Sequence, residues 1–255
     1  MELSASSFHH KTICNAKPLP TYLVRCMVAQ SKSYFYLNQT SHQLFYSFCF
    51  YSCHPEKKLT NASIFHNQDF STIHLLSGGR AEIGAGRGSF IESFPLFGYD
   101  LKDYNELFEE KLDLLLKIRD EANVTWSGKL RPAMVNQTVY PRSENLPVWI
   151  AVGGTPSSVL RAARLGLPLI VAIIGGNPSQ FTPLMDYYKE AYLAHGHDPD
   201  AMQLAVHAHT FVSEDPKVID DYFHYYSRQM NRVGQSRGWS AFTRGQYEAG
   251  RSRHG

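Results

Sequence analysis

An arginine between two glycines is the first place in this chain where residue types and spacing suit chemistry. Gly86, Arg87 and Gly88 follow a short stretch, residues 81–85, that can lie extended. Glycine leaves the backbone open to a ligand, and a guanidinium grips an anionic group such as phosphate through two parallel hydrogen bonds. In parallel α/β folds, ligands bind at the carboxyl ends of the strands. We therefore expect Arg87 to contact an anion at a strand end.

A second candidate anion site is the run Gly-Gly-Thr-Pro-Ser-Ser that begins at Gly153. Thr155 suits the N-cap of a helix, Pro156 suits its first position, and Ser158 can turn its hydroxyl toward the helix start. Free backbone N–H groups and the positive end of the helix dipole favour an anion there, and Gly153 and Gly154 let a phosphate approach the backbone. The alternative is a plain strand-to-helix turn with a good cap, and the residues alone do not decide between the two.

Two histidines are the candidate catalytic residues. His207 and His209 are separated by one residue in a predicted strand, so both side chains point to the same face of it. On an interior face they would contact a bound ligand, and the alternative is a packed or rim histidine. Two histidines at this spacing could also bind a metal, but no third ligand is evident, and the four cysteines lack a paired zinc pattern. We predict no metal site.

The elements that must position these residues alternate between strand and helix after about residue 69. Continuous apolar strands alternating with helices indicate a parallel sheet that is covered on both faces. Apolar residues at helical spacing predict the helix 104–120 most clearly. The other predicted helices are 155–165, 178–195 and 216–234, the predicted strands are 81–85, 147–152, 167–174 and 202–212, and residues 123–142 are expected to form an irregular rim segment.

Taken together, these motifs resemble the flavin-dependent luciferase-like monooxygenase family, the (β/α)8-barrel group that includes bacterial luciferase. The resemblance runs from the segment around Arg87 through residues 94–100, 149–156 and 162–168, and it covers about residues 69–255. It implies an α/β fold, a partial (β/α)8 TIM barrel of the bacterial luciferase-like type in which roughly the fourth to seventh β-α units are recognisable.

The resemblance also implies a function and a cofactor. It suggests a flavin-dependent oxidoreductase, a monooxygenase that acts on paired donors with reduced FMN and dioxygen, or with a deazaflavin in related branches. The flavin phosphate would be held by Arg87, Gly153, Gly154, Thr155 and Ser158, with Gly154 offering a backbone contact only. The implied partners are a flavin reductase that supplies reduced flavin, a small-molecule substrate and a second copy in a homodimer. Pocket loops set the substrate, so the fold does not name it.

A nicotinamide-binding Rossmann enzyme is a rival interpretation of Gly84, Gly86 and Gly88. The third glycine comes one residue early for a dinucleotide fingerprint, and no acidic residue closes a Rossmann unit in the expected context.

Residues 1–68 do not share the resemblance. They are rich in Ser, Tyr, Phe, His and Cys and show little periodicity, and the family's glutamate-histidine-histidine segment has no counterpart there. We expect an atypical leader at 1–68, disordered or frame-shifted, and a luciferase-like partial barrel domain at 69–255 in a truncated chain. The alternative is a leader that supplies divergent strands. A catalytically inactive remnant with weak flavin binding is therefore the second functional hypothesis.

Bulk composition describes an ordinary soluble protein. A formal charge of +2 and a charged fraction of 19% over 255 residues give no reason to expect nucleic acid or an anionic membrane as partner. No apolar run approaches the roughly 20 residues that span a bilayer. The first residues lack the basic start and apolar core of a secretory signal, so we expect a cytoplasmic location.

Overall fold

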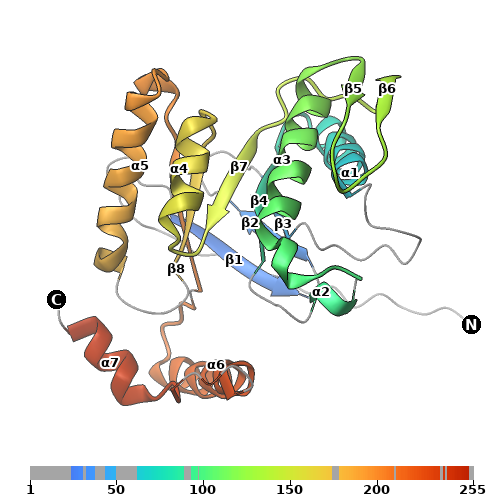
Figure 1. Cartoon of the computed structure of the whole chain (residues 1–255). Helices are drawn as coiled ribbons and strands as arrows, with labels where there is room; N and C mark the ends of the chain where they lie inside the picture. The colour runs from blue at the N-terminus through green and yellow to red at the C-terminus, as the bar shows by residue number, and fades with distance from the viewer. Residues whose placement is uncertain are drawn as a thin grey trace, which may run out of the picture.

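A closed seven-stranded barrel carries the candidate residues in the computed structural model (Figure 1). The structure describes residues 24–30, 33–37, 44–49, 62–88, 93–96, 98–173, 178–209, 211–235, 238 and 240–252. The barrel order is β1-β2-β3-β4-β7-β8-β9. The strands are β1 (Val24–Gln30), β2 (Ser33–Leu37), β3 (Leu44–Cys49), β4 (Ala81–Gly86), β7 (Val148–Val152), β8 (Leu169–Ile173) and β9 (Leu204–Ala208).

The barrel combines two kinds of strand pairing. From β3 through β4, β7, β8 and β9 to β1 all neighbours are parallel, whereas β1 pairs with β2 and β2 pairs with β3 antiparallel. The structure thus describes three strands within residues 1–68, the segment that the sequence sets apart as a leader. Closure of the barrel leaves none of these seven strands with an unpaired edge.

Helices cover the outside of the parallel strands. They are α1 (Ala62–Leu76), α3 (Tyr104–Asp120), α4 (Pro156–Arg164) and α5 (Thr182–Ala194), and short turns of helix lie at α2 (Ser93–Leu96), η2 (Leu101–Asp103), η3 (Pro178–Phe181) and η4 (Pro199–Ala201). The outward side chains of β4, β7 and β8 pack with apolar residues of these helices into one large core. Burial of this apolar surface is the main force that holds the helices on the sheet.

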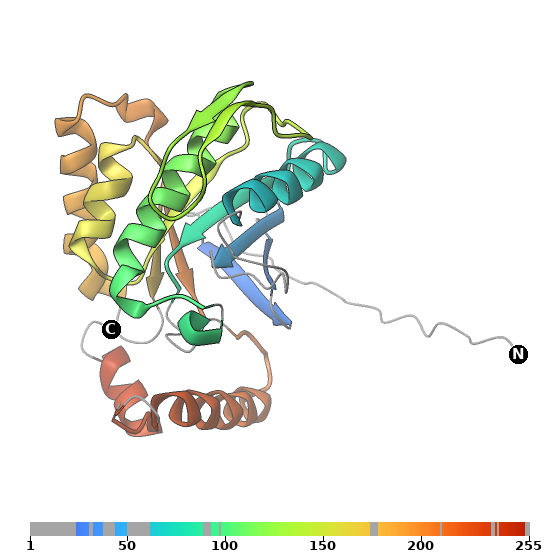
Figure 2. The ribbon, with the colours of Figure 1, turned by 45° about the vertical axis from the view of Figure 1, so that its right-hand side comes forward.

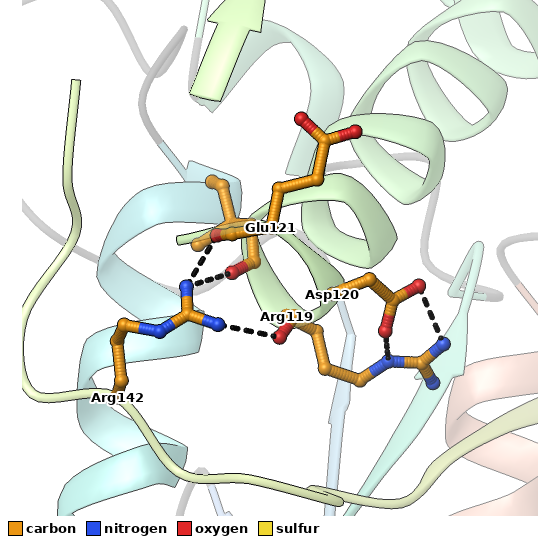
Figure 3. A network of polar contacts seen from close by, with 5 residues as sticks. Arg119, Asp120, Glu121 and Arg142 are labelled. Carbon is orange, nitrogen blue, oxygen red and sulfur yellow. Dashed lines mark hydrogen bonds and ion pairs between the residues drawn. The ribbon is translucent and has the colours of Figure 1, made fainter. Parts of the chain in front are cut away.

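Helix α3 forms as its apolar periodicity predicts, over Tyr104–Asp120. At its carboxyl end the guanidinium of Arg142 donates to the carbonyl oxygens of Ile118, Arg119 and Glu121, which have no partner within the helix (Figure 3). Beside them, Arg119 forms an ion pair with Asp120, with 2.6 Å between Nε and Oδ1 (Figure 3). The end of the helix is therefore fixed by the segment that leads into β7.

The predicted rim segment differs from the expectation. Residues 123–142 contain two short antiparallel strands, β5 (Val124–Trp126) and β6 (Met134–Gln137). Val124 and Met134 pack with Leu114 and Ile118 of α3, so the pair lies against α3 on the outside of the barrel. Strands of three or four residues are too short to show an alternation of buried and exposed side chains. Periodicity in the sequence therefore did not predict them.

The last two helices lie apart from this outer layer. Helices α6 (Pro216–Gln235) and α7 (Arg244–Ser252) lie beyond the end of the barrel toward which the β7 arrow points (Figures 1 and 2). That end is the carboxyl end of the parallel strands. The predicted helix 216–234 is confirmed almost to the residue, whereas the predicted strand 202–212 is shorter, at Leu204–Ala208.

Candidate anion-binding site at the barrel end

The register of two neighbouring strands brings the two candidate anion sites together. Parallel β4 and β7 pair Gly84 with Trp149 and Ala85 with Ile150, so both strands end at the same level. A Cβ built on Gly86 would lie 3.4 Å from the Cβ of Ala151, so the two backbones approach closely there. The chain after β4 and the chain after β7 therefore leave the barrel side by side.

Arg87 reaches across this junction to α4. Its Nη2 donates to the Ser158 hydroxyl at 2.9 Å, although the two residues are 71 positions apart, and its Nη1 donates to Oδ1 of Asn105 at 2.6 Å. The guanidinium also lies 4.8 Å from the ring centroid of Tyr104, whose hydroxyl donates to the Gly88 carbonyl at 2.8 Å. Because α3 and α4 both contact this side chain, the arginine is held at the strand ends.

The start of α4 has the geometry of an anion cradle. Thr155 is the N-cap in extended conformation and makes no side-chain hydrogen bond to the helix, and Pro156 follows at the first helical position. Gly154 has φ +123°, a conformation that side-chain-bearing residues rarely adopt, and open space lies in front of both Gly153 and Gly154. The Arg87 guanidinium meets the Ser158 hydroxyl in the first turn of this helix. Together with the backbone N–H groups of a helix start, this donor set suits a phosphate.

The structure places the two histidines at the end of β9. His207 is 9% exposed on the same strand face as the buried Ala205. The rings of His207 and His209 lie 6.1 Å apart in an edge-on arrangement, and Nδ1 of His209 lies 2.9 Å from the Tyr226 hydroxyl on α6. Burial, and secondly the neighbouring His209, lower the pKa of His207 to about 4, and burial lowers the pKa of His209.

A buried acid in the barrel interior escaped the sequence analysis. Trp149 Nε1 donates to a carboxylate oxygen of Glu82 at 2.6 Å, and the two residues are 3% and 5% exposed. Trp149 packs with Ile170 and Ala205 in an inward cluster that is separate from the large outer core. The sequence held part of the signal, because Glu82 lies on the same strand face as Gly84 and Gly86. Its hydrogen-bond partner, Trp149, follows only from the register of the two strands.

Asn105 and Tyr104 were also missed, although they hold Arg87. Both stand in the first turn of α3, where their types suggest only a capped helix start. Among the described residues no group of three histidine, cysteine or acidic side chains could hold a metal ion. In the same part of the chain no helix has the length and apolarity needed to cross a membrane. Of the four cysteines, Cys14 and Cys53 lie outside the described residues.

Residues 66–254 match the family of luciferase-like monooxygenases, and the chain belongs to this family. It is 32% identical over 103 residues to an F420-dependent glucose-6-phosphate dehydrogenase of Amycolatopsis mediterranei, an alignment that covers 39% of this chain and 30% of that protein. It is 24% identical over 170 residues to the uncharacterized protein y4vJ of Sinorhizobium fredii, covering 65% and 48% of the two chains. The chain therefore spans less than half the length of these relatives.

Two solved structures share the fold. Monooxygenase RslO1 from Streptomyces bottropensis superposes with a TM-score of 0.59 at 22% identity, over 68% of this chain and 54% of that one. An F420-dependent secondary alcohol dehydrogenase in complex with an F420-acetone adduct superposes with a TM-score of 0.52 at 19% identity, over 66% and 50%. The predicted family and the predicted α/β, partial-barrel fold are thereby confirmed. The roles predicted for the site residues stay predictions.

Proposed function

We propose that this chain binds the phosphate of a flavin at the ends of β4 and β7 and acts as a flavin-dependent oxidoreductase. The observation that carries the proposal is the hydrogen bond between Arg87 and Ser158 at the start of α4. It joins the two motifs that each predict an anion site, in a chain that belongs to the luciferase-like monooxygenase family. The finer assignment is a monooxygenase that acts on paired donors with reduced FMN and dioxygen.

The residues present fit a phosphate group. Arg87 has five N–H donors, and its hydrogen bonds to Asn105 and Ser158 leave others for phosphate oxygens. The Thr155 hydroxyl and the first N–H groups of α4 supply further donors, and the partial positive charge of the helix start favours the anion. A side chain at Gly153 or Gly154 would project into the open space where the phosphate would approach.

The flavin would supply the redox chemistry, while the protein binds, orients and shields it. Neighbouring strands lie about 4.8 Å apart, so the end of β9 is roughly 10 Å from the end of β7. His207 and His209 therefore stand where a ring system extending from the phosphate site toward β9 would lie. His207 is buried, so it would offer a neutral imidazole there, which can donate or accept one hydrogen bond.

The same site would also hold a deazaflavin. Two relatives with F420 in their names support this alternative, one by sequence and one by fold. A small-molecule substrate, a flavin reductase as source of reduced FMN, a homodimer and a cytoplasmic location complete the proposal. They rest on the family and not on a contact in this chain.

Fluorescence quenching of FMN on titration with the purified chain tests the proposal. We expect saturable binding and weaker binding of riboflavin, which lacks the phosphate. Arg87→Met should weaken FMN binding about 10- to 100-fold, because a hydrogen bond to a charged group contributes about 1.5–3 kcal/mol. Riboflavin binding should change little.

Arg80→Met is the matched control, because Arg80 is exposed and precedes β4 while Arg87 follows it. Equal FMN affinity in the two variants would contradict the phosphate site, and so would the absence of FMN binding to the folded chain. Parallel titration with F420 decides between the cofactors. FMN binding without reductase-coupled oxygen consumption would instead support the catalytically inactive alternative.

A further inference from the structure

One face of helix α6 carries exposed apolar side chains that the proposed flavin site does not use. Val218, Tyr222 and Tyr225 follow one another at intervals of four and three residues, so they lie on one face of the helix. Val218 is 42% exposed and Tyr225 is 63% exposed. Phe211, on the segment before α6, is also exposed and stacks on Tyr222 with 4.0 Å between the ring centroids. These side chains form a contiguous apolar patch, which is typical of an interaction surface.

Other side chains of α6 hold the helix to the rest of the chain. Phe223 packs against Phe242 and against Tyr247 of α7, at 5.9 Å and 5.0 Å between ring centroids. The Tyr226 hydroxyl lies 2.9 Å from Nδ1 of His209 at the end of β9. Figures 1 and 2 show α6 at the edge of the molecule, beyond the barrel end. The helix is therefore anchored through one side, while the apolar patch on its other side stays exposed.

Charged side chains border the patch in an order that is complementary to itself. Asp221 and Arg228 are exposed and lie seven residues apart, about two turns, so they share one edge of the patch. Along the helix axis, Asp221 lies about 6 Å before Tyr225 and Arg228 lies about 4.5 Å after it. Among the ion pairs of the described residues none involves Asp221 or Arg228, whereas Asp220 pairs with Arg244 of α7 at 2.9 Å.

We propose that this face of α6 binds the same face of α6 in a second copy of the chain, with the two helices antiparallel. A twofold axis through the contact at Tyr225 reverses the helix direction and keeps each edge of the patch on its own side. Asp221 of each copy then faces Arg228 of the other copy, and the two Tyr225 rings meet at the centre. A parallel arrangement would instead place Asp221 opposite Tyr222, with no ion pair.

The remaining positions of the patch suit the same antiparallel pairing. On the other edge, Tyr222 and the exposed Gln229 are also seven residues apart, so the phenol of one copy faces the amide of the other. Val218 faces Arg232, whose methylene stem can cover the valine while its charge reaches water. No like charges meet in this arrangement. A second copy therefore supplies, by symmetry alone, the order of charges that the patch requires.

The size of the patch predicts a weak dimer. The strip from Val218 to Arg232 is about 21 Å long and about 10 Å wide. One such strip buries less than the roughly 800 Å² per partner of a standard interface, so we expect a dissociation constant above about 1 μM. The inference gives a surface to the homodimer of the proposed function, and it is independent of the flavin site. An assay without flavin therefore tests it separately.

Sedimentation velocity of the full chain without flavin, from about 1 μM to about 500 μM, measures the association. We expect a reversible equilibrium between monomer and dimer. Tyr225→Ser should raise the dissociation constant at least about tenfold, because aromatic side chains at the centre of an interface contribute most of the affinity. Tyr187→Ser, which changes an exposed tyrosine of α5, is the matched control and should leave the constant unchanged. A monomer at every concentration overturns the proposal.

Exchanging the charges tests the antiparallel arrangement. Asp221→Arg and Arg228→Asp each place like charges opposite one another at both ends of the contact, so each variant alone should dimerise at least about tenfold more weakly. An equimolar mixture of the two variants should regain the dimer, because two arginines of one copy then face two aspartates of the other. A mixture that stays monomeric, with circular dichroism showing intact folds, overturns the pairing. Undiminished dimerisation of either variant alone also overturns it, since the interface would then lie elsewhere.

Discussion

Acid should destabilise this protein through one buried histidine. Burial and the neighbouring His209 lower the pKa of His207 from 6.5 to about 4. In that interval the folded chain keeps His207 neutral, whereas the unfolded chain protonates it. Because the unfolded state then binds more protons, the free energy of unfolding falls as the pH falls through this window. Above pH 6.5 the effect vanishes, since both states are neutral.

The size of the effect follows from the shift. A lowering from 6.5 to about 4 corresponds to about 3 kcal/mol when the pH reaches the folded pKa, and about 2 kcal/mol of this is lost between pH 7 and pH 5. His207→Gln removes the titration and keeps a neutral side chain that can form hydrogen bonds. The wild type should therefore lose about 2 kcal/mol more than His207→Gln over that interval.

Urea unfolding at pH 7 and pH 5 measures this difference, with unchanged m-values as the check that both proteins unfold from the same compact state. His209, on the same segment, lies 6.1 Å from His207 between ring centroids and contacts Tyr226 of α6, so both of these groups can modify the result. His224→Gln, an exposed histidine of α6, is the control and should follow the wild type. Parallel loss of stability in wild type and His207→Gln would refute a buried neutral imidazole at this position.

Three further predictions concern single positions. Between pH 8 and 10.5 the wild type should gain about 3 kcal/mol of stability, because Lys111 stays protonated over this range only in the unfolded state. Lys111→Met should remove this gain in urea titrations. Gly154→Ala should cost about 1–3 kcal/mol in thermal unfolding because φ is +123° there, whereas Gly153→Ala, in equally open space, should cost less than about 1 kcal/mol. Trp149→Phe should cost about 2–3 kcal/mol in the same assay, since Glu82 loses a buried donor, and a change below about 0.5 kcal/mol would contradict that contact.

The sequence predicted those parts of the fold that depend on local pattern. Helix α3 was predicted to the residue because its apolar positions recur at helical spacing. Strands β4, β7 and β8 followed from short apolar runs between glycines and helices. The β5–β6 pair could not be predicted in this way, because three or four residues with mixed exposure carry no period. The antiparallel pairs β1–β2 and β2–β3 are local, with Gln30 opposite Ser33 and Leu37 opposite Leu44, but this part of the sequence shows little periodicity, so the strands were not predicted.

The candidate site also combines features that the local sequence predicts with contacts that only the fold reveals. Ligands bind at the carboxyl ends of parallel strands, and this rule predicted Arg87 and Ser158 at one edge of the sheet. The register of β4 and β7 explains why the two side chains are in contact. Lys111 was overlooked because a charged residue in a helix suggests a solvated face. The signal was its spacing of four residues from Leu107 and from Leu115, which places it within the buried stripe.

Helix α3 helps to position the arginine of the proposed phosphate site, so contacts that hold this helix bear on the site. Asn105 in the first turn of α3 accepts a hydrogen bond from Arg87. The helix is held by its apolar stripe, by the ion pair of Glu109 with Arg161 of α4 at 2.5 Å, and by Arg142 at its carboxyl end. Arg87→Met leaves these three contacts in place, so it should weaken FMN binding without loosening the helix. Loss of one of the three contacts should weaken FMN binding indirectly, because the position of Arg87 depends on where α3 lies.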